Sequence, residues 1–248
     1  MGYESKTGNN ERLKIVQVGH ANVPINRSEG GCGGLEEVVI TLDGTYNVRG
    51  HESFVIASSD SDVYGTLLPT ITSMYGPGRG HLKADAEHIE EGFTEHARQA
   101  LDYIREIRPH VIHDHTGYHR DRSFSERLYD PKFGLRTADE IQSEEMPPIL
   151  NTVHGYVTEE NTPMYRRFAK LFEGRNISFS AVSQFQRGIF RGLLDVDYVV
   201  HNAIDVNSYK FGEEGKGYNF NMSSIYPGKG THVAIDTSLK AGQKIIVG

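Results

Sequence analysis

Two histidines and an aspartate follow a short apolar run in the segment VIHDHTG, residues 111–117. Side chains of these types can bind a metal ion, transfer a proton or hydrogen-bond a polar ligand. Because side chains alternate along a strand, His113 and His115 share one face, and a metal pair is conceivable there. However, the chain has 12 histidines, so one His-x-His pair is weak evidence for a metal. We therefore expect His113, Asp114 and His115 to hydrogen-bond a polar ligand at the end of a strand.

A glycine-rich segment, residues 29–36 (EGGCGGLE), leads into an amphipathic helical pattern. Glycines let backbone N–H groups approach an anion closely, and a helix N-terminus adds partial positive charge. The dinucleotide-binding fingerprint needs its glycines directly after a strand, whereas here about a dozen residues intervene and Glu36 replaces the third glycine. The segment can therefore be a phosphate-binding loop or a flexible turn before a helix.

Polar side chains also follow three other apolar runs. His154 follows the run at 149–153, Ser183 precedes a helical pattern, and Asn202 follows the run at 197–201. Ser183 can serve simply as a helix N-cap and Asn202 simply as a turn residue. In an open parallel sheet, however, ligands bind beyond the carboxyl ends of the strands. All these positions are therefore candidates for one site.

The elements that position these residues alternate between short apolar runs and amphipathic helical patterns. The expected strands are 13–18, 54–57, 111–113, 149–153, 177–182 and 197–201, and the expected helices are 34–47, 84–107, 163–172 and 184–194. This alternation predicts an α/β fold with a Rossmann-like, doubly wound parallel sheet and helices on both faces. Residues 116–148 are polar and irregular, and we expect a long surface insertion near the site there.

Residues 212–248 are expected to form a linker and the start of a second domain, after a first domain over 1–211. A strand at 218–224, a helix at 231–241 and a strand at 244–247 follow the glycine-rich stretch 212–217. This pattern predicts a truncated β-α-β unit that cannot close a sheet by itself.

Composition excludes several classes of protein. The formal net charge of −7 argues against a dedicated nucleic-acid-binding surface. Cys32 is the single cysteine, so no internal disulfide can form. Residues 1–12 lack the apolar core of a signal peptide, and no stretch approaches the roughly 18 apolar residues that cross a bilayer. We expect a cytoplasmic protein without a transmembrane segment.

Taken together and in this order, the motifs resemble one family. GGCGGLEEVV, VIHDHTG, TVHG, AVSQFQR and VVHNAIDVNSY are similar to the N-terminal domain of glycosyltransferase family 4. The following YPGKGTHVAIDTSLKAGQKIIVG is similar to the start of that family's C-terminal domain. The resemblance covers residues 13–248, and it predicts the N-terminal half of a two-Rossmann-domain (GT-B type) glycosyltransferase.

The resemblance implies a retaining enzyme of the hexosyltransferase type that binds a nucleotide-sugar donor between two facing domains and needs no metal ion or other cofactor. The N-terminal domain would mainly hold a sugar or glycoconjugate acceptor. By motif match, His154 is the catalytic-site histidine that contacts the donor sugar. The N–H groups around Gly33 and Gly34 would face the donor diphosphate, which Lys229 would neutralise. The positions expected to bind acceptor or sugar are His113, Asp114, His115, Ser183 and Asn202.

The sequence departs from the family pattern in two ways. Ser223 and Ser224 stand where the family usually has Gly-Arg, so a rigid, charge-assisted contact with the diphosphate is missing. The family's paired glutamates belong to a region that the sequence does not reach. We therefore expect the isolated chain to be inactive, as a fragment or component of an enzyme. We also expect a partner chain, or a second copy in a homodimer, to cover the incomplete second unit.

Two other functions stay open. The first is a non-catalytic remnant of the same family that still binds a sugar or an acceptor. The second is a metal-dependent hydrolase that uses His113, Asp114 and His115, for which the spacing is weak evidence. Two Asp-x-Asp pairs, at 60–62 and 195–197, are compatible with a metal-using transferase, but such pairs arise easily by chance in an acidic chain.

Overall fold

The computed structural model describes residues 11–27, 33–74, 86–116, 123–204, 206, 210, 212, 214–223, 225 and 227–248, without the side chains of 86–88. The first half of the glycine-rich segment, residues 29–32, lies outside these ranges. The chain divides into two compact units, Met1–Ile204 and Asp205–Gly248. Each unit has its own parallel sheet. No helix in the described ranges is long and apolar enough to cross a membrane.

Unit 1 contains a seven-stranded sheet in the order β3-β2-β1-β4-β5-β6-β7, and every neighbouring pair is parallel. The strands are β1 (Lys14–Val18), β2 (Glu52–Ala57), β3 (Thr66–Pro69), β4 (Val111–Asp114), β5 (Ile149–Val153), β6 (Ile177–Ala181) and β7 (Tyr198–Val199). The predicted Rossmann-like α/β fold is confirmed. The chain builds outward from β1 in one direction and then returns to β4, so the topological switch point lies between β1 and β4.

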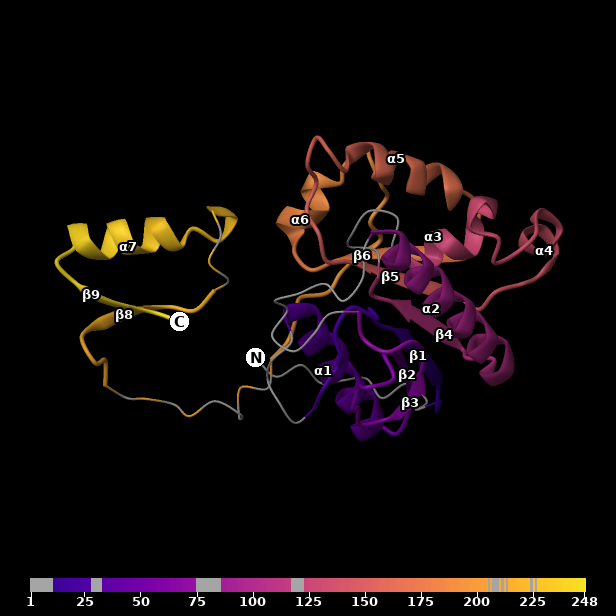
Figure 1. The fold of residues 1–248 in the computed structure, drawn as a ribbon, viewed down its shortest axis with the longest axis horizontal. Helices are drawn as coiled ribbons and strands as arrows, with labels where there is room; N and C mark the ends of the chain where they lie inside the picture. The colour runs from indigo at the N-terminus through magenta and orange to yellow at the C-terminus, as the bar shows by residue number, and fades with distance from the viewer. Residues whose placement is uncertain are drawn as a thin grey trace. The chain divides into compact units, whose positions relative to one another are not determined.

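Helices cover both faces of this sheet (Figure 1). They are α1 (Gly34–Val48), α2 (Ala86–Ile107), α3 (Phe124–Tyr129), α4 (Ala138–Ser143), α5 (Thr162–Leu171) and α6 (Gln184–Ile189), with a 3-10 turn η2 (Pro131–Phe133). On one face, Val39 and Ile40 of α1 pack against Val55 and Ala57 of β2. The main core lies on the other face, where α2, α3 and α5 meet the sheet.

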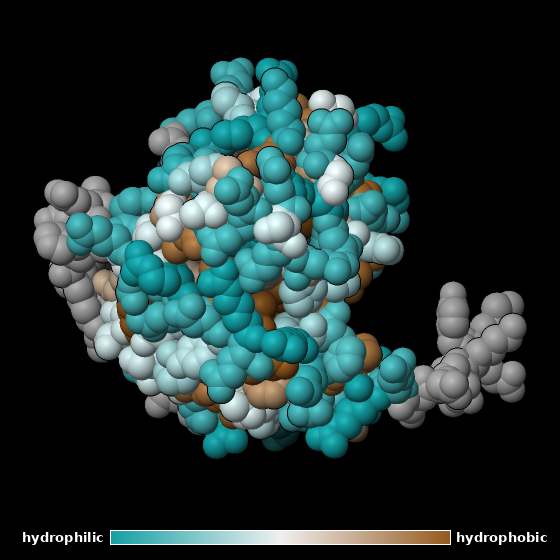
Figure 2. Space-filling model, turned by 90° about the vertical axis from the view of Figure 1, so that its right-hand side faces the viewer, coloured by the Kyte–Doolittle hydropathy of each residue, from teal (hydrophilic) through white to brown (hydrophobic). Residues whose placement is uncertain are grey.

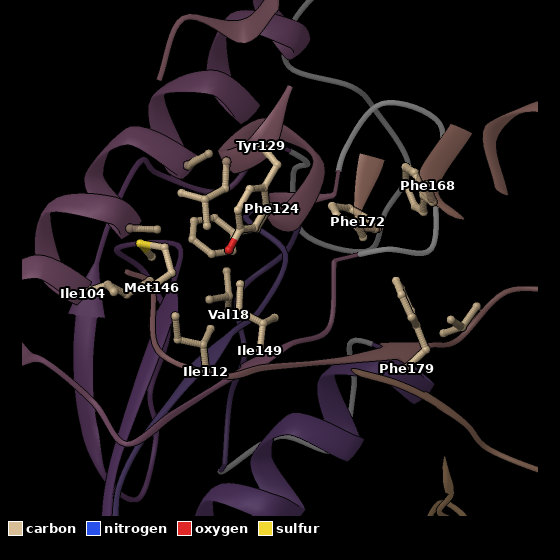
Figure 3. Packing of buried hydrophobic residues seen from close by; sticks show 14 of the residues in the cluster. Val18, Ile104, Ile112, Phe124, Tyr129, Met146, Ile149, Phe168, Phe172 and Phe179 are labelled. Atoms are coloured by element: carbon tan, nitrogen blue, oxygen red, sulfur yellow. The ribbon is translucent and has the colours of Figure 1, made fainter. Parts of the chain in front are cut away.

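The main core is built from aliphatic strand residues and aromatic helix residues. In Figure 3, Phe124 and Tyr129 of α3 lie over Val18, Ile112 and Ile149 of the sheet. Burial of such side chains stabilises the fold by about 1.5–3 kcal/mol each. The face seen in Figure 2 is mostly hydrophilic, with hydrophobic residues in small patches, as expected when the apolar surface is enclosed.

The segment 116–148 differs from its sequence prediction. All six residues of α3 are buried, so the expectation of a surface insertion is wrong for this part. The polar side chains of the segment find partners inside the protein. Ser125 donates to Asp114, and the buried Arg127 donates to Thr94 and Glu90 of α2, both at 2.7 Å. Internal hydrogen bonds therefore allow a polar sequence to be packed against the core.

Other differences concern short elements. The predicted helix at 184–194 ends at Ile189, and the predicted strand at 197–201 shrinks to the two residues of β7. β3 was not expected, because its four residues, TLLP, end in a proline and lack a periodic pattern. As an edge strand, β3 tolerates that proline.

Unit 2 has the predicted β-α-β arrangement. β8 (Tyr218–Asn221) and β9 (Lys244–Val247) pair in parallel, and they are connected through a 3-10 turn η4 (Pro227–Lys229) and helix α7 (Thr231–Lys240). Apolar side chains remain exposed on the strands and on the helix, among them Phe220, Val233 and Leu239. This small unit therefore buries little of its own apolar surface.

Asp43 fastens α1 to the segment between β2 and β3. Its buried carboxylate accepts hydrogen bonds from the Ser53 hydroxyl (2.5 Å) and from the backbone N–H groups of Tyr64 (2.7 Å) and Gly65 (2.9 Å). A Cβ at position 65 would lie 2.3 Å from the Ser53 carbonyl oxygen and 2.7 Å from Asp43 Oδ1. Only glycine fits between the carboxylate and β2 without displacing one of them.

Replacing Gly65 with alanine should lower the free energy of unfolding by about 2–4 kcal/mol, because the new methyl group must displace backbone or break the Asp43 hydrogen bonds. The matched control is Gly188→Ala, since no described atom lies within 4 Å of a Cβ added there. In that helix position alanine should be neutral or stabilising. Urea unfolding of both variants measures the difference. Equal stability of Gly65→Ala and wild type would contradict this packing.

Candidate functional site

The carboxyl edge of the sheet brings together histidines from two neighbouring strands. His113 lies near the end of β4, His115 directly follows it, and His154 directly follows β5. The Nδ1 atom of His115 lies 3.2 Å from Nε2 of His154, and the two rings stack with centroids 5.5 Å apart. The ring centroid of His113 is 3.9 Å from that of His115. The three histidines thus form one contiguous group beside the topological switch point.

Burial keeps these histidines uncharged. Desolvation lowers the pKa of His113 to about 3, with a smaller contribution from His154, and lowers the pKa of His154 to about 4. It also holds the pKa of the fully enclosed His115 well below its usual value of 6.5, helped by the neighbouring histidines. The group is therefore neutral at physiological pH, so it can donate or accept hydrogen bonds but supplies no positive charge.

Hydroxyl groups under the histidines continue the polar network across the sheet. Nε2 of His113 lies 2.7 Å from the Thr152 hydroxyl, which lies 2.7 Å from the Ser180 hydroxyl. Thr152 and Ser180 are register partners on β5 and β6, so their side chains emerge on the same face. Tyr46 of α1 approaches the other nitrogen of His113 at 3.5 Å. The site thus rests on three strands and on the helix that follows the glycine-rich segment.

Asp114 does not join the histidines. Side-chain alternation turns it to the opposite face of β4, where it is fully buried. Its oxygens accept hydrogen bonds from Thr116, Ser125 and Asn151, with distances of 2.5–3.0 Å. These contacts engage both carboxylate oxygens and hold the start of α3 against the sheet. In this geometry, Asp114 supports the site from inside the protein.

The orientation of His113, Asp114 and His115 tests the hypothesis of a metal site in this segment. His113 and Asp114 lie on opposite faces of β4, so the segment HDH cannot direct all three side chains at one ion. In the part of the chain that the structure describes, no group of three or more histidine, cysteine, aspartate or glutamate side chains is placed to hold a metal. The geometry therefore gives no support to the metal-dependent hydrolase hypothesis.

Two uncharged amides hold the loop that carries His154. Gln186 donates from Nε2 to the Gly155 carbonyl (2.6 Å) and accepts from the backbone N–H of Val182 (2.7 Å). Asn161 donates to the Tyr156 carbonyl at 2.8 Å. The loop is thereby held at Gly155 and Tyr156, directly after His154. Neither amide was predicted to take part in the site.

Ser183 caps α6, because its hydroxyl accepts the backbone N–H of Gln186 at 3.0 Å. The Ser-x-x-Gln spacing of a capping box is the one pattern that could have identified Gln186. Its side chain departs from that motif, however, by reaching Val182 and Gly155 and not the backbone N–H of Ser183. Ser183 thus fixes α6, and α6 in turn positions the amide that holds the His154 loop.

Gly33 and Gly34 lie at the N-terminus of α1. Gly33 is the N-cap and provides no side-chain hydrogen bond to the first turn. Gly34 is exposed, and a Cβ added there would meet no described atom within 4 Å. Packing among the described residues therefore does not require a glycine at position 34. Access of a ligand to the backbone remains an explanation for it.

Two predicted positions remain, Asn202 in unit 1 and Lys229 in unit 2. Asn202 is exposed beyond β7. Lys229 is exposed at the end of η4, just before α7, and belongs to unit 2. Ser223, also in unit 2, hydrogen-bonds Asn221 and Thr231 through its hydroxyl, at 3.1 and 3.3 Å.

Comparison with known proteins shows a shared fold. No protein-family model matches the sequence, and no curated protein is significantly similar to it. The structure is similar to that of sucrose-phosphate synthase (tll1590) from Thermosynechococcus elongatus, with a TM-score of 0.61 and 11% identity over 95% of this chain and 62% of that chain. A weaker similarity, with a TM-score of 0.46 and 13% identity, is to the glycotransferase of kitacinnamycin, over 95% of this chain and 65% of that one. The chain thus has a glycosyltransferase-like fold and spans less than two thirds of the length of either protein.

Neutral buried histidines make stability depend on pH. In the unfolded chain they bind protons below their ordinary pKa of 6.5, whereas His113, His154 and the buried His96 of α2 stay neutral down to about pH 4 or 3. The unfolded state therefore binds more protons, and stability is present above pH 6.5 and is lost as the pH falls toward 4. The expected slope is about 1.4 kcal/mol per pH unit for each such histidine.

Urea unfolding at pH 7.5, 6.0 and 5.0 measures this loss. His96→Gln should reduce the pH dependence of the free energy of unfolding by the contribution of one histidine, because glutamine does not titrate. Its amide can still hydrogen-bond near Gly19 and Thr70. His201→Gln, at an exposed position, should leave the slope unchanged. Wild-type stability that does not vary between pH 7.5 and 5.0 would show that these histidines are not held neutral.

Proposed function

We propose that this protein is a retaining glycosyltransferase that uses a nucleotide-sugar donor, or a component of such an enzyme. The observation that carries the proposal is the contact of His154 with His115 at the carboxyl edge of the sheet. There a half-buried, neutral imidazole follows β5, in a loop that Gln186 holds by its hydrogen bond to the Gly155 carbonyl. Such a group suits a hydroxyl-rich, uncharged ligand part such as a sugar. The order of sequence motifs and the glycosyltransferase-like fold support the same function.

The proposed reaction needs no protein nucleophile. The bond between the sugar C1 and the diphosphate oxygen breaks, and the acceptor oxygen bonds to C1 on the same face. The acceptor proton passes to an oxygen of the leaving diphosphate, which gives a nucleoside diphosphate and a glycosylated acceptor. Negative charge that builds up on the diphosphate would be stabilised by N–H groups at the start of α1, near Gly33 and Gly34, and by Lys229. The proposal uses no metal ion.

His154 would contribute a hydrogen bond to the donor sugar and no charge. Because burial lowers its pKa to about 4, the imidazole carries one proton at physiological pH. A neutral ring can hold a sugar hydroxyl without attracting the diphosphate into the sugar's place. Positioning of this kind favours the transition state when the bond is short and preorganised.

Unit 2 carries the observation that favours the second candidate, a non-catalytic sugar- or acceptor-binding protein. Ser224, which lies outside the described residues, stands where the resembled family has the arginine of its Gly-Arg pair, and Ser223 stands at the glycine position. A serine cannot replace the bidentate contact of an arginine with phosphate. Loss of one such contact weakens binding by about 1.5–3 kcal/mol, so we expect weak donor affinity in this chain.

A pair of substitutions separates the diphosphate contact from the sugar contact. Gly34→Val should weaken binding of nucleoside diphosphates and nucleotide sugars alike, by about tenfold or more, because the side chain blocks the start of α1. His154→Ala should leave nucleoside diphosphate affinity unchanged and remove the additional affinity that the sugar confers. Isothermal titration with UDP, ADP and GDP and with their hexose conjugates measures both effects.

Gly188→Val is the matched control, because this glycine also has open space around its Cβ position but lies on α6. It should bind every ligand as wild type does. Wild-type affinities in both site variants would refute the proposed donor site. Measurable sugar transfer by the wild-type chain would exclude the non-catalytic candidate.

A further inference from the structure

The contact between His115 and His154 shares a single proton between two nitrogens. Nδ1 of His115 and Nε2 of His154 are 3.2 Å apart, and a neutral imidazole protonates only one of its two nitrogens. Two arrangements can form this hydrogen bond. In one, His154 donates from Nε2, and the proton of His115 then resides on its own Nε2. In the other, His115 donates from Nδ1, and the proton of His154 then resides on its Nδ1.

Burial distinguishes the two arrangements. Nε2 of His115 is enclosed and has no hydrogen-bond partner among the described residues. In the first arrangement this atom would carry an orphaned N–H, which is the rarer and more unfavourable kind of unsatisfied group in protein interiors. In the second arrangement it is only an unused lone pair. The second arrangement is therefore favoured.

The ring of His115 cannot escape this choice by turning over. Its backbone N–H bonds the Val18 carbonyl at 3.0 Å, which fixes the residue beside β1. The ring lies between His113, 3.9 Å away between centroids, and His154, 5.5 Å away. Rotation by 180° would replace Nδ1 by carbon at the contact and lose the hydrogen bond to His154.

His154 differs from His115 because its second nitrogen is not enclosed. The residue is half-buried, and Nδ1 makes no hydrogen bond to any described residue. A proton on Nδ1 is therefore available to a ligand, whereas a proton on Nε2 would be used inside the protein. The tautomer decides whether the site offers a donor or an acceptor.

We propose that His115 is a positioning residue that fixes His154 in its Nδ1–H tautomer, so that His154 presents a hydrogen-bond donor to an oxygen acceptor of the ligand. On the proposed function, that acceptor is a hydroxyl oxygen of the sugar; this last step rests on the proposed function, and the tautomer does not. His154 in this state is a donor of one hydrogen bond and not a general base, because the lone pair of its Nε2 already accepts the proton of His115. The site then selects ligands with an exposed oxygen acceptor.

Long-range ¹H–¹⁵N NMR of the uniformly ¹⁵N-labelled full chain, without ligand at pH 7.5, tests the tautomer. A protonated and an unprotonated ring nitrogen differ in chemical shift and in their two-bond correlations, so each histidine reports its own tautomer. His154→Gln and His115→Asn assign the signals by their disappearance. We expect both His115 and His154 to be protonated on Nδ1. A wild-type His154 protonated on Nε2 would overturn the proposal without any further variant.

Two substitutions at position 115 test its positioning role. His115→Asn keeps an N–H donor near the place of Nδ1, so His154 should remain in the Nδ1–H tautomer. His115→Phe keeps a planar ring but donates no hydrogen bond, and at least half of the His154 population should then move its proton to Nε2. A purely structural role would not produce this difference between two folded variants. An unchanged tautomer in folded His115→Phe would overturn the role of His115, and so would a shifted tautomer in His115→Asn.

Titration of the same labelled protein with UDP-glucose, ADP-glucose and GDP-mannose separates this inference from the proposed function. An Nδ1–H tautomer that responds to His115→Phe, in a protein that binds none of these donors, supports the positioning role and argues against the proposed function. An Nε2–H tautomer in a protein that binds them in a His154-dependent way overturns the positioning role alone.

Discussion

Side-chain alternation along β4 is the constraint on which the rest of this edge depends. β4 is the central strand of the seven, and its neighbours β1 and β5 fix its register. Asp114 faces one side, where it holds α3 to the core through Ser125. His113 and His115 belong to the other side, with the hydroxyl of Thr152 beneath them. One strand of four residues therefore supplies Asp114, which holds a buried helix, and His113, which belongs to the candidate site.

The same burial that shapes the site determines its electrostatics. Enclosed imidazoles lose their charged form because desolvation penalises it, as the lowered pKa values of His113 and His154 show. The loop around His154 is likewise held by the uncharged amides of Gln186 and Asn161. A neutral hydrogen-bonding surface of this kind is suited to a polyol. An anion such as a diphosphate must be bound by other groups. In the proposed enzyme, the start of α1 and Lys229 would fill that role, so that different elements would recognise the sugar and the diphosphate.

Much of the fold is predictable from the sequence, because its strands are short apolar runs separated by strongly periodic helices. β5 and β9 match their predicted bounds, and the helix predicted at 231–241 ends one residue earlier in α7. β3 and α3 were missed, because neither has a periodic pattern and α3 depends on partners distant in sequence, such as Asp114. Tertiary hydrogen bonds of this sort leave no local signature.

The candidate site was predictable only in part. His113, His115 and His154 follow strand ends, and strand-end positions converge by topology alone, so their proximity could be expected. Because side chains alternate along a strand, Asp114 must face away from the two histidines that flank it. This separation was not among the predictions from the sequence. The brace by Gln186 could not be inferred, because its reach to Gly155 depends on how α6 sits beside the loop after β5. The role of Lys229 stays a prediction, since it belongs to a separate unit.

Histidine ring Cε1–H chemical shifts, followed by NMR while the full chain is titrated with a nucleotide sugar, test most directly whether this edge binds sugar. NMR detects weak complexes, so ligand can be raised to about 10 mM, where millimolar binding populates the complex. We predict that the signals of His115 and His154 move. Those of His51 and His110, which hydrogen-bond the amino-terminal side of β1, should stay fixed. Nucleoside diphosphate alone should move the site signals less. Unmoved signals of His115 and His154 at saturating ligand, or equal shifts with nucleoside diphosphate alone, would contradict a sugar site at this edge.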